Sequence, residues 1–95
     1  MDTINTMPEI SRFYGIIIKM FFGDHVPPHF HAYYNEFEAF YSIETGETFH
    51  GELPKKQHRL VQAWIELHRE ELMQNWEILV TNSTNNAFFK IKPLD

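Results

Sequence analysis

The sequence predicts an α+β domain: a small, mostly antiparallel sheet of four or five strands, packed on one face by a C-terminal helical segment. Runs of β-branched and aromatic residues, separated by turn residues, fill the first half of the chain and predict strands. Apolar residues then recur at helical spacing from Lys55 to about Val80. With 95 residues, 43% of them hydrophobic, the chain can close one modest core.

The chain is expected to form one domain over residues 9–95, preceded by a flexible N-terminal arm over residues 1–8. The run RFYGIIIKMFF, residues 12–22, is apolar on both alternating faces apart from Arg12 and Lys19. Such a run predicts a central strand. The GDHVPP segment then ends this strand, because two successive prolines remove two backbone donors.

A hairpin is predicted next, with strands over residues 29–34 and 37–43. A two-residue turn at Asn35 and Glu36 fixes the register of the two strands. Because side chains alternate along a strand, one face becomes an apolar core face and the other is mixed and polar. The core face carries Phe30, Ala32, Tyr34, Phe37, Ala39 and Tyr41, and the polar face carries His29, His31, Tyr33, Glu38, Phe40 and Ser42.

The second half of the chain begins with a turn at ETGE, after which residues 48–53 are expected to form a short strand. Pro54 fits the first position of the helix. The apolar stripe of the helix is interrupted, because Glu71 and Asn75 fall inside its arc. We therefore expect the helical segment to be kinked or split near His68 to Glu71, which would spare both side chains from burial.

The last segment, AFFKIKP at residues 87–93, predicts a final strand in which apolar residues alternate with lysines.

The apolar positions of the preceding helix are Leu60, Trp64, Leu67, His68, Leu72, Trp76 and Leu79. His68 is expected to be a satisfied core histidine, whereas His50 and His58 are expected at the surface.

Three of the six histidines lie in DHVPPHFHAYY, residues 24–34. His29 and His31 are two residues apart in a predicted strand, so both imidazoles point to the same face, at a separation that suits chelation of one divalent ion such as zinc. A third ligand would come from Glu38 or, from the preceding loop, His25 or Asp24. The same pair, His29 and His31, is the candidate catalytic pair, acting as acid and base.

Two other interpretations of this pair stay open. The imidazoles can hydrogen-bond to Tyr33, Glu38, Ser42 or the backbone and order the hairpin without a ligand, or they can contact a ligand or partner. No cofactor is expected unless the histidines hold a divalent metal. The residues predicted to bind a partner are Tyr33 and Phe40 on the sheet and Lys55, Lys56 and Arg59 at the helix start, where positive charges oppose the helix dipole and indicate an acidic partner.

Charge and composition exclude several classes. Thirteen acidic and eight basic residues give a formal net charge of −5, which argues against a general nucleic-acid binder. The chain has no cysteine and no apolar run long enough to span a bilayer. We expect a cytoplasmic protein without membrane contact.

Four segments carry a family resemblance: MPEISRFYGIIIKMFFGDHVPPHFHAYY, ETGE followed by GELP, WIELHREELMQNW and KIKPL. Together, from Met7 to Leu94, they resemble the bacterial domain-of-unknown-function family numbered forty-one sixty. Its D-H-x-P-P-H-F-H-A signature corresponds to Asp24 to Ala32. The resemblance implies no established activity.

Members of this family are often encoded beside another small protein of unknown function. The resemblance therefore implies a protein-interaction component of a toxin-antitoxin-like two-gene module, with the toxin as one role for this chain. The expected partner is the protein encoded by the neighbouring gene, and a homo-oligomer is the other assembly considered. The alternative function is a metal-dependent hydrolase or ribonuclease that uses His29 and His31.

Overall fold

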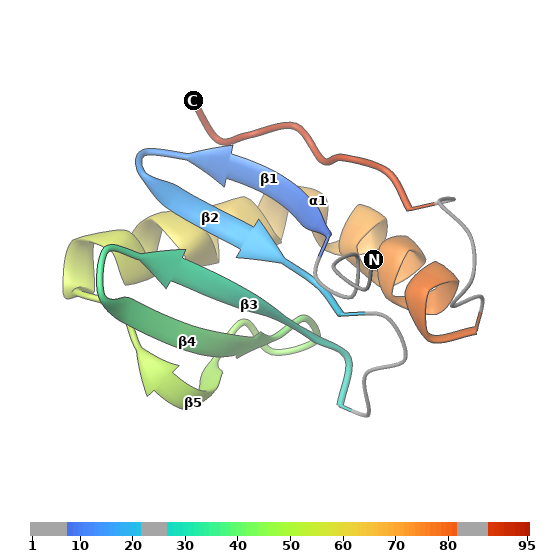
Figure 1. The fold of residues 1–95 in the computed structure, drawn as a ribbon, viewed down its shortest axis with the longest axis horizontal. Coiled ribbons are helices and arrows are strands. Elements are labelled where there is room, and N and C mark those ends of the chain that lie inside the picture. Colours follow the sequence, from blue (N-terminus) through green and yellow to red (C-terminus); the bar gives the residue numbers. More distant parts are fainter. Residues whose placement is uncertain (1–7, 22–26, 82–87) are drawn as a thin grey trace, which may run out of the picture.

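The computed structural model describes residues 8–21, 27–81 and 88–95 (Figure 1). These residues form a five-stranded antiparallel sheet and one long helix, so the predicted α+β class is confirmed. The predicted N-terminal arm falls almost wholly outside the described residues. The elements, in chain order and in the order of the sheet, are β1 (Glu9–Phe13), β2 (Ile16–Lys19), β3 (His29–Tyr34), β4 (Phe37–Ser42) and β5 (Thr48–Glu52), followed by the helix α1 (Lys55–Thr81).

The predicted central strand over residues 12–22 is wrong, because this part of the chain turns back on itself as the β1–β2 hairpin. The turn is formed by Tyr14 and Gly15, whose φ angles are 49° and 80°. Two-residue hairpin turns of this kind need positive φ at both central positions. Tyrosine rarely adopts such a conformation, so the apolar run around it does not reveal the turn.

The β3–β4 hairpin has the predicted register, with His29 opposite Ser42 and Tyr34 opposite Phe37. Asn35 supplies the positive φ of the turn, at 52°. The core face is confirmed in its central part, where side chains are fully buried against α1. Those residues are Phe30, Ala32, Ala39 and Tyr41.

The helix α1 is kinked at His68, as predicted, where φ is −127° and ψ is 23°. The kink turns the apolar side of the helix, so that Leu72 is buried after it while Leu67 is 68% exposed. The predicted place of Leu67 in the apolar stripe is therefore wrong. Glu71 stays partly exposed, and its carboxylate pairs with Nδ1 of His68.

Asn75 is fully buried, although the kink was expected to spare it. Its amide group donates to the backbone oxygen of Phe89 (2.7 Å) and accepts from the backbone nitrogen of Phe89 (2.9 Å). A buried amide whose donor and acceptor are both used is tolerated in a core. Asn75 therefore ties the C-terminal residues to the second half of α1.

Residues 88–95 run beside β1 without forming the predicted last strand (Figure 1). They make one backbone hydrogen bond to that strand, from Ile91 to Ile10 (2.9 Å). The indole of Trp64 donates to the backbone oxygen of Lys92 (2.9 Å). Side chains of α1, more than a backbone ladder, thus hold this segment.

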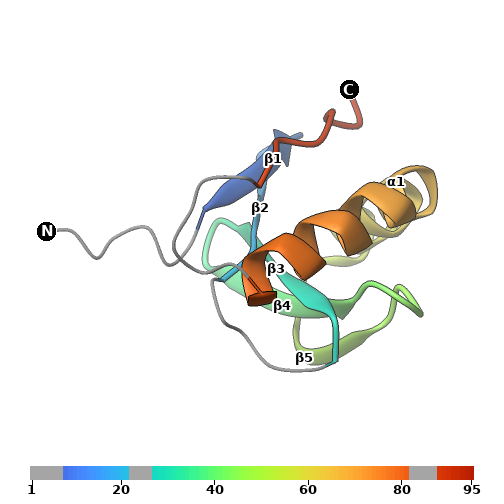
Figure 2. The ribbon, with the colours of Figure 1, turned by 90° about the vertical axis from the view of Figure 1, so that its right-hand side faces the viewer.

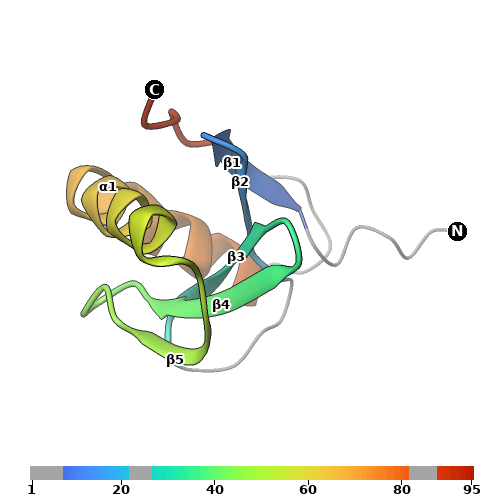
Figure 3. The ribbon, with the colours of Figure 1, turned by 90° about the vertical axis from the view of Figure 1, so that its left-hand side faces the viewer.

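The helix covers one face of the sheet, as Figures 2 and 3 show from the two ends of the molecule. The opposite face, called the open face below, is covered by no helix or strand of the described residues. It carries the side chains that alternate with the core positions of β3 and β4. No helix in the described part of the chain has the length and apolar character needed to cross a membrane.

Candidate functional site

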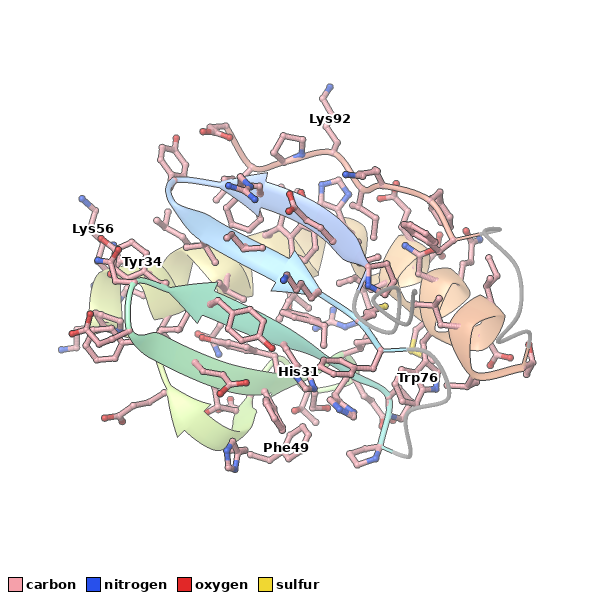
Figure 4. The ribbon with its side chains drawn as sticks, viewed as in Figure 1. His31, Tyr34, Phe49, Lys56, Trp76 and Lys92 are labelled. Atoms are coloured by element: carbon pink, nitrogen blue, oxygen red, sulfur yellow. The ribbon has the colours of Figure 1, made fainter. Side chains whose placement is uncertain are left out.

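Six aromatic and histidine side chains, called the ring cluster below, form a group that lies at the open face and extends to Trp76 of α1. The ring of His31 stacks on Phe40 with a centroid distance of 3.8 Å, and it lies 4.3 Å from Phe21. The rings of His29 and His31 stack at 5.3 Å. Figure 4 shows where three members lie. The ring cluster consists of Phe21, His29, His31, Phe40, Phe49 and Trp76.

Two members reach the ring cluster by routes that the hydrophobic pattern does not reveal. The pairing of β4 with β5 skips Phe49, so that this residue is the extra one in a β-bulge. Its ring meets His29 edge-on at 5.3 Å, yet 49% of the residue is exposed. Trp76 comes from α1 beyond the kink and lies 5.3 Å from His29.

The neighbouring rings make the two histidines more buried than the sequence predicts. The sequence places His29 and His31 on the polar, less buried face, but each is only 7% exposed. The rings of the cluster contact both imidazoles, and Nδ1 of His31 also lies 3.4 Å from the hydroxyl of Tyr33. The structure therefore brings the candidate catalytic pair together among aromatic rings.

The protonation of His29 follows from a backbone contact. Nδ1 of His29 lies 2.6 Å from the carbonyl oxygen of Pro27. A carbonyl oxygen only accepts hydrogen bonds, so Nδ1 carries the proton and Nε2 keeps the lone pair in the neutral ring. An imidazole held in this way suits a general base or a metal ligand.

The metal candidates are not all brought together. Glu38 lies opposite Tyr33 in the hairpin, and the Tyr33 hydroxyl lies 3.4 Å from Nδ1 of His31. Asp24 and His25 lie outside the described residues. Within residues 8–21, 27–81 and 88–95, no three histidine, aspartate or glutamate side chains are grouped as a metal site.

The phenol of Tyr33 is a weaker acid than an exposed tyrosine, and a titration can measure this. Burial, and then the negative charge and hydrogen bond of Glu38, raise the pKa of Tyr33 to about 12. The stability that the neutral phenol contributes is complete below the usual pKa of about 10 and is lost as the pH rises through the folded-state pKa. We expect Glu38→Gln to lower the pKa of Tyr33 in an ultraviolet titration of the phenols, read as the difference from Tyr33→Phe. An unchanged titration would contradict the role of Glu38.

The predicted partner-binding residues fall into two separate groups. Tyr33 and Phe40 are half-buried side chains of the open face. Lys55, Lys56 and Arg59 are exposed on the first turns of α1, in the other layer. The structure thus keeps the two groups, the hairpin residues and the basic helix start, on separate surfaces.

The remaining histidines contact aromatic neighbours. His50 is exposed and lies 4.5 Å from the Phe40 ring, at the margin of the ring cluster. His58 was expected at the surface but is half-buried, because its Nδ1 lies 2.8 Å from the hydroxyl of Tyr41 in the core. Burial raises the pKa of that Tyr41 hydroxyl above its usual range. His68, paired with Glu71, is satisfied as predicted.

The fold and the ring cluster define a small two-layer domain in which no described helix or strand covers the ring-bearing face of the sheet. The model of the domain of unknown function DUF4160 matches residues 15–77, more than half of the chain. The chain therefore belongs to the DUF4160 family. The matched range contains every member of the ring cluster. No match was found among curated proteins or among solved structures.

Proposed function

We propose that the chain acts in the bacterial cytoplasm as a protein-interaction component of a toxin-antitoxin-like two-gene module, with the open face as its contact surface. The observation that supports this most is the partial exposure of the Phe49 ring. The bulge holds its ring on the ring cluster, but about half of the residue remains exposed. Partly exposed aromatic side chains on a rigid surface are typical anchors of protein interfaces.

The surroundings of Phe49 add to this proposal. Phe40 lies beside it, at a centroid distance of 6.0 Å, and itself stacks on His31. These rings sit on paired strands, so a partner would meet a surface that is already ordered. Family members are often encoded beside another small protein, so we take the protein encoded by the neighbouring gene as the partner.

Co-expression with the neighbouring gene's protein tests the proposal. We expect a stable heterocomplex that copurifies at micromolar concentration, and we expect Phe49→Ser to weaken its Kd by about tenfold or more, since interface aromatic residues contribute most of the binding energy. Leu67→Ser is the matched control, because Leu67 is 68% exposed on α1 away from the open face. Failure to copurify, or equal effects of the two substitutions, would count against this function.

A second candidate function is hydrolysis, of RNA or another substrate, by His29 and His31. The observation that favours it is the fixed proton on Nδ1 of His29 beside the stacked ring of His31. One imidazole would act as base and the other as acid, with or without a divalent metal.

Substitution of both histidines by glutamine tests this second function. If His29 and His31 are the catalytic residues, the double variant loses any hydrolytic activity or toxicity of the chain. Circular dichroism should show that the variant keeps its fold. Native mass spectrometry with added zinc tests the metal-dependent form, which predicts zinc bound at pH 7.5 and released as the imidazoles protonate towards pH 5. Toxicity that survives in the double variant would exclude the proposal.

A further inference from the structure

The two hairpin turns and the first turn of α1 lie at one end of the molecule (Figures 1 and 3). Three ring-cluster members, His31, Phe49 and Trp76, lie away from this end (Figure 4). Tyr14 in the first turn is 54% exposed, and Phe37 at the start of β4 is 36% exposed. The Tyr34 ring lies against Gly15, within 3.3 Å of where a Cβ would be, and so connects the two turns. Figure 4 places Tyr34 and Lys56 at this same end.

The backbone of Tyr14 has an unfavourable conformation, which lowers the stability of the folded state. Its φ of 49° is left-handed, which costs a residue with a Cβ about 1–2 kcal/mol and is usually left to glycine or asparagine. The side chain does not belong to the core or to the apolar residues packed against it. A strained and exposed tyrosine stabilises little within the chain, so its ring is available for a contact outside it.

Three positive side chains stand at this end without an ion-pair partner among the described residues. Lys55, Lys56 and Arg59 are exposed, and none forms an ion pair in the part of the chain that the structure describes. By contrast, Arg12 and Arg69 pair with nearby glutamates at 2.8 Å and 3.1 Å. In a chain with thirteen acidic residues and a net charge of −5, these three cations lie within five residues of one another at the start of α1.

We propose that this end binds an acidic segment of another protein, one that also carries an aromatic or aliphatic side chain. The binding surface, called the hairpin-tip surface, consists of Tyr14, Phe37, Lys55, Lys56 and Arg59. Carboxylates of the segment meet the three cations, and its apolar side chain packs on the exposed rings. The hairpin-tip surface is separate from the open face, so this proposal and the proposed function can fail independently.

A pocket beside the cations offers room for a further side chain of the segment. It has a volume of about 430 Å³ and lies between the end of β5 and the start of α1, with Leu53 and Pro54 on its apolar side. Its full lining is Thr48, Glu52, Leu53, Pro54, Lys55 and His58. A nucleic acid is the less suitable polyanion, because the charge of −5 repels a long phosphate backbone that three cations cannot neutralise.

Fluorescence anisotropy of the full chain with labelled probes tests the proposal. The probes are a short peptide of alternating glutamate and phenylalanine, the same peptide with lysine in place of glutamate, and oligothymidylate. We expect the glutamate peptide to bind best and its affinity to fall with salt. The double variant Lys56→Glu with Arg59→Glu should weaken its Kd by about tenfold or more. Lys92→Glu, which changes a lysine far from this end (Figure 4), should leave it unchanged.

Tyr14→Asn provides the second variant. Asparagine tolerates the left-handed turn, so this change should raise the urea midpoint while weakening the Kd for the glutamate peptide by about threefold or more. A weaker affinity in a more stable protein cannot come from misfolding. Absent binding, preference for the lysine peptide or oligothymidylate, an equal loss in Lys92→Glu, or self-association abolished by the double variant would each overturn the proposal.

Discussion

Trp64→Ala is expected to lower the free energy of unfolding by about 3–5 kcal/mol, because it removes a large aromatic side chain from the core and leaves a cavity. Trp64 is fully buried, and its ring lies 5.2 Å from Phe13 and 5.8 Å from Phe30. It joins α1 to both hairpins. Its indole nitrogen also donates to the backbone oxygen of Lys92, so the substitution loosens the C-terminal segment as well.

Urea unfolding, followed by far-ultraviolet circular dichroism, measures this effect. Leu67→Ala on the same helix is the control, and its exposed side chain predicts a change within about 0.5 kcal/mol. Small domains are stable by only about 5–15 kcal/mol, so the tryptophan variant should be partly unfolded at moderate temperature. Similar costs for the two substitutions would show that Trp64 is not the centre of the core.

Gly51→Ala should be the most disruptive change in the sheet, lowering the free energy of unfolding by about 2–4 kcal/mol. A Cβ at this position would stand 2.2 Å from the backbone oxygen of Glu38, in a residue whose φ is +68°. Backbone atoms of β4 cannot give way as a flexible side chain can. The strand β5 would therefore shift, and Phe49 would be drawn away from the ring cluster.

Gly46→Ala separates the cost of the positive φ from the cost of the clash with the backbone of β4. Gly46 has a similar φ of +77°, but the nearest atom to its Cβ position is Nη2 of Arg69, at 3.9 Å. Its substitution should cost only the left-handed conformation, about 1–2 kcal/mol. The difference between the two alanine variants in chemical denaturation reports the clash at Gly51. If the two costs are equal, the close approach of β5 to β4 is not significant.

The sequence predicts the parts of the fold in which local signals agree. The β3–β4 register follows from one turn at Asn35 and an alternation that a single-residue slip would invert. The kink of α1 follows from Glu71, whose charge conflicts with a straight apolar stripe. In both cases the sequence pattern and the burial of one face impose the same answer.

The sequence does not predict features that depend on a backbone irregularity or a long-range contact. The Tyr14-Gly15 turn uses a tyrosine in an unfavourable conformation, which propensity argues against. The bulge at Phe49 breaks the alternation that predicts which face a side chain occupies. Gly51, two residues after Phe49, is the local signal for that irregularity, since glycine inside a short strand often marks a bulge.

The candidate site was therefore predicted in part. The pair His29 and His31 was identified with the correct face and partners in the hairpin. The burial of His29 was not, because its neighbours Phe49 and Trp76 come from an edge strand and from beyond a helix kink. The unpaired state of Lys55, Lys56 and Arg59 also needed the fold, which alone shows that no described carboxylate reaches them.

Amide hydrogen exchange of the free chain and of the copurified heterocomplex tests most directly whether the open face is a contact surface. A partner bound there should slow the exchange of amides in β4 and β5, which lie beneath the ring cluster and at its exposed edge. Exchange over residues 66–70, around the kink of α1, should not change. Slower exchange at these helical residues, with β4 and β5 unaffected, would contradict the proposed contact surface.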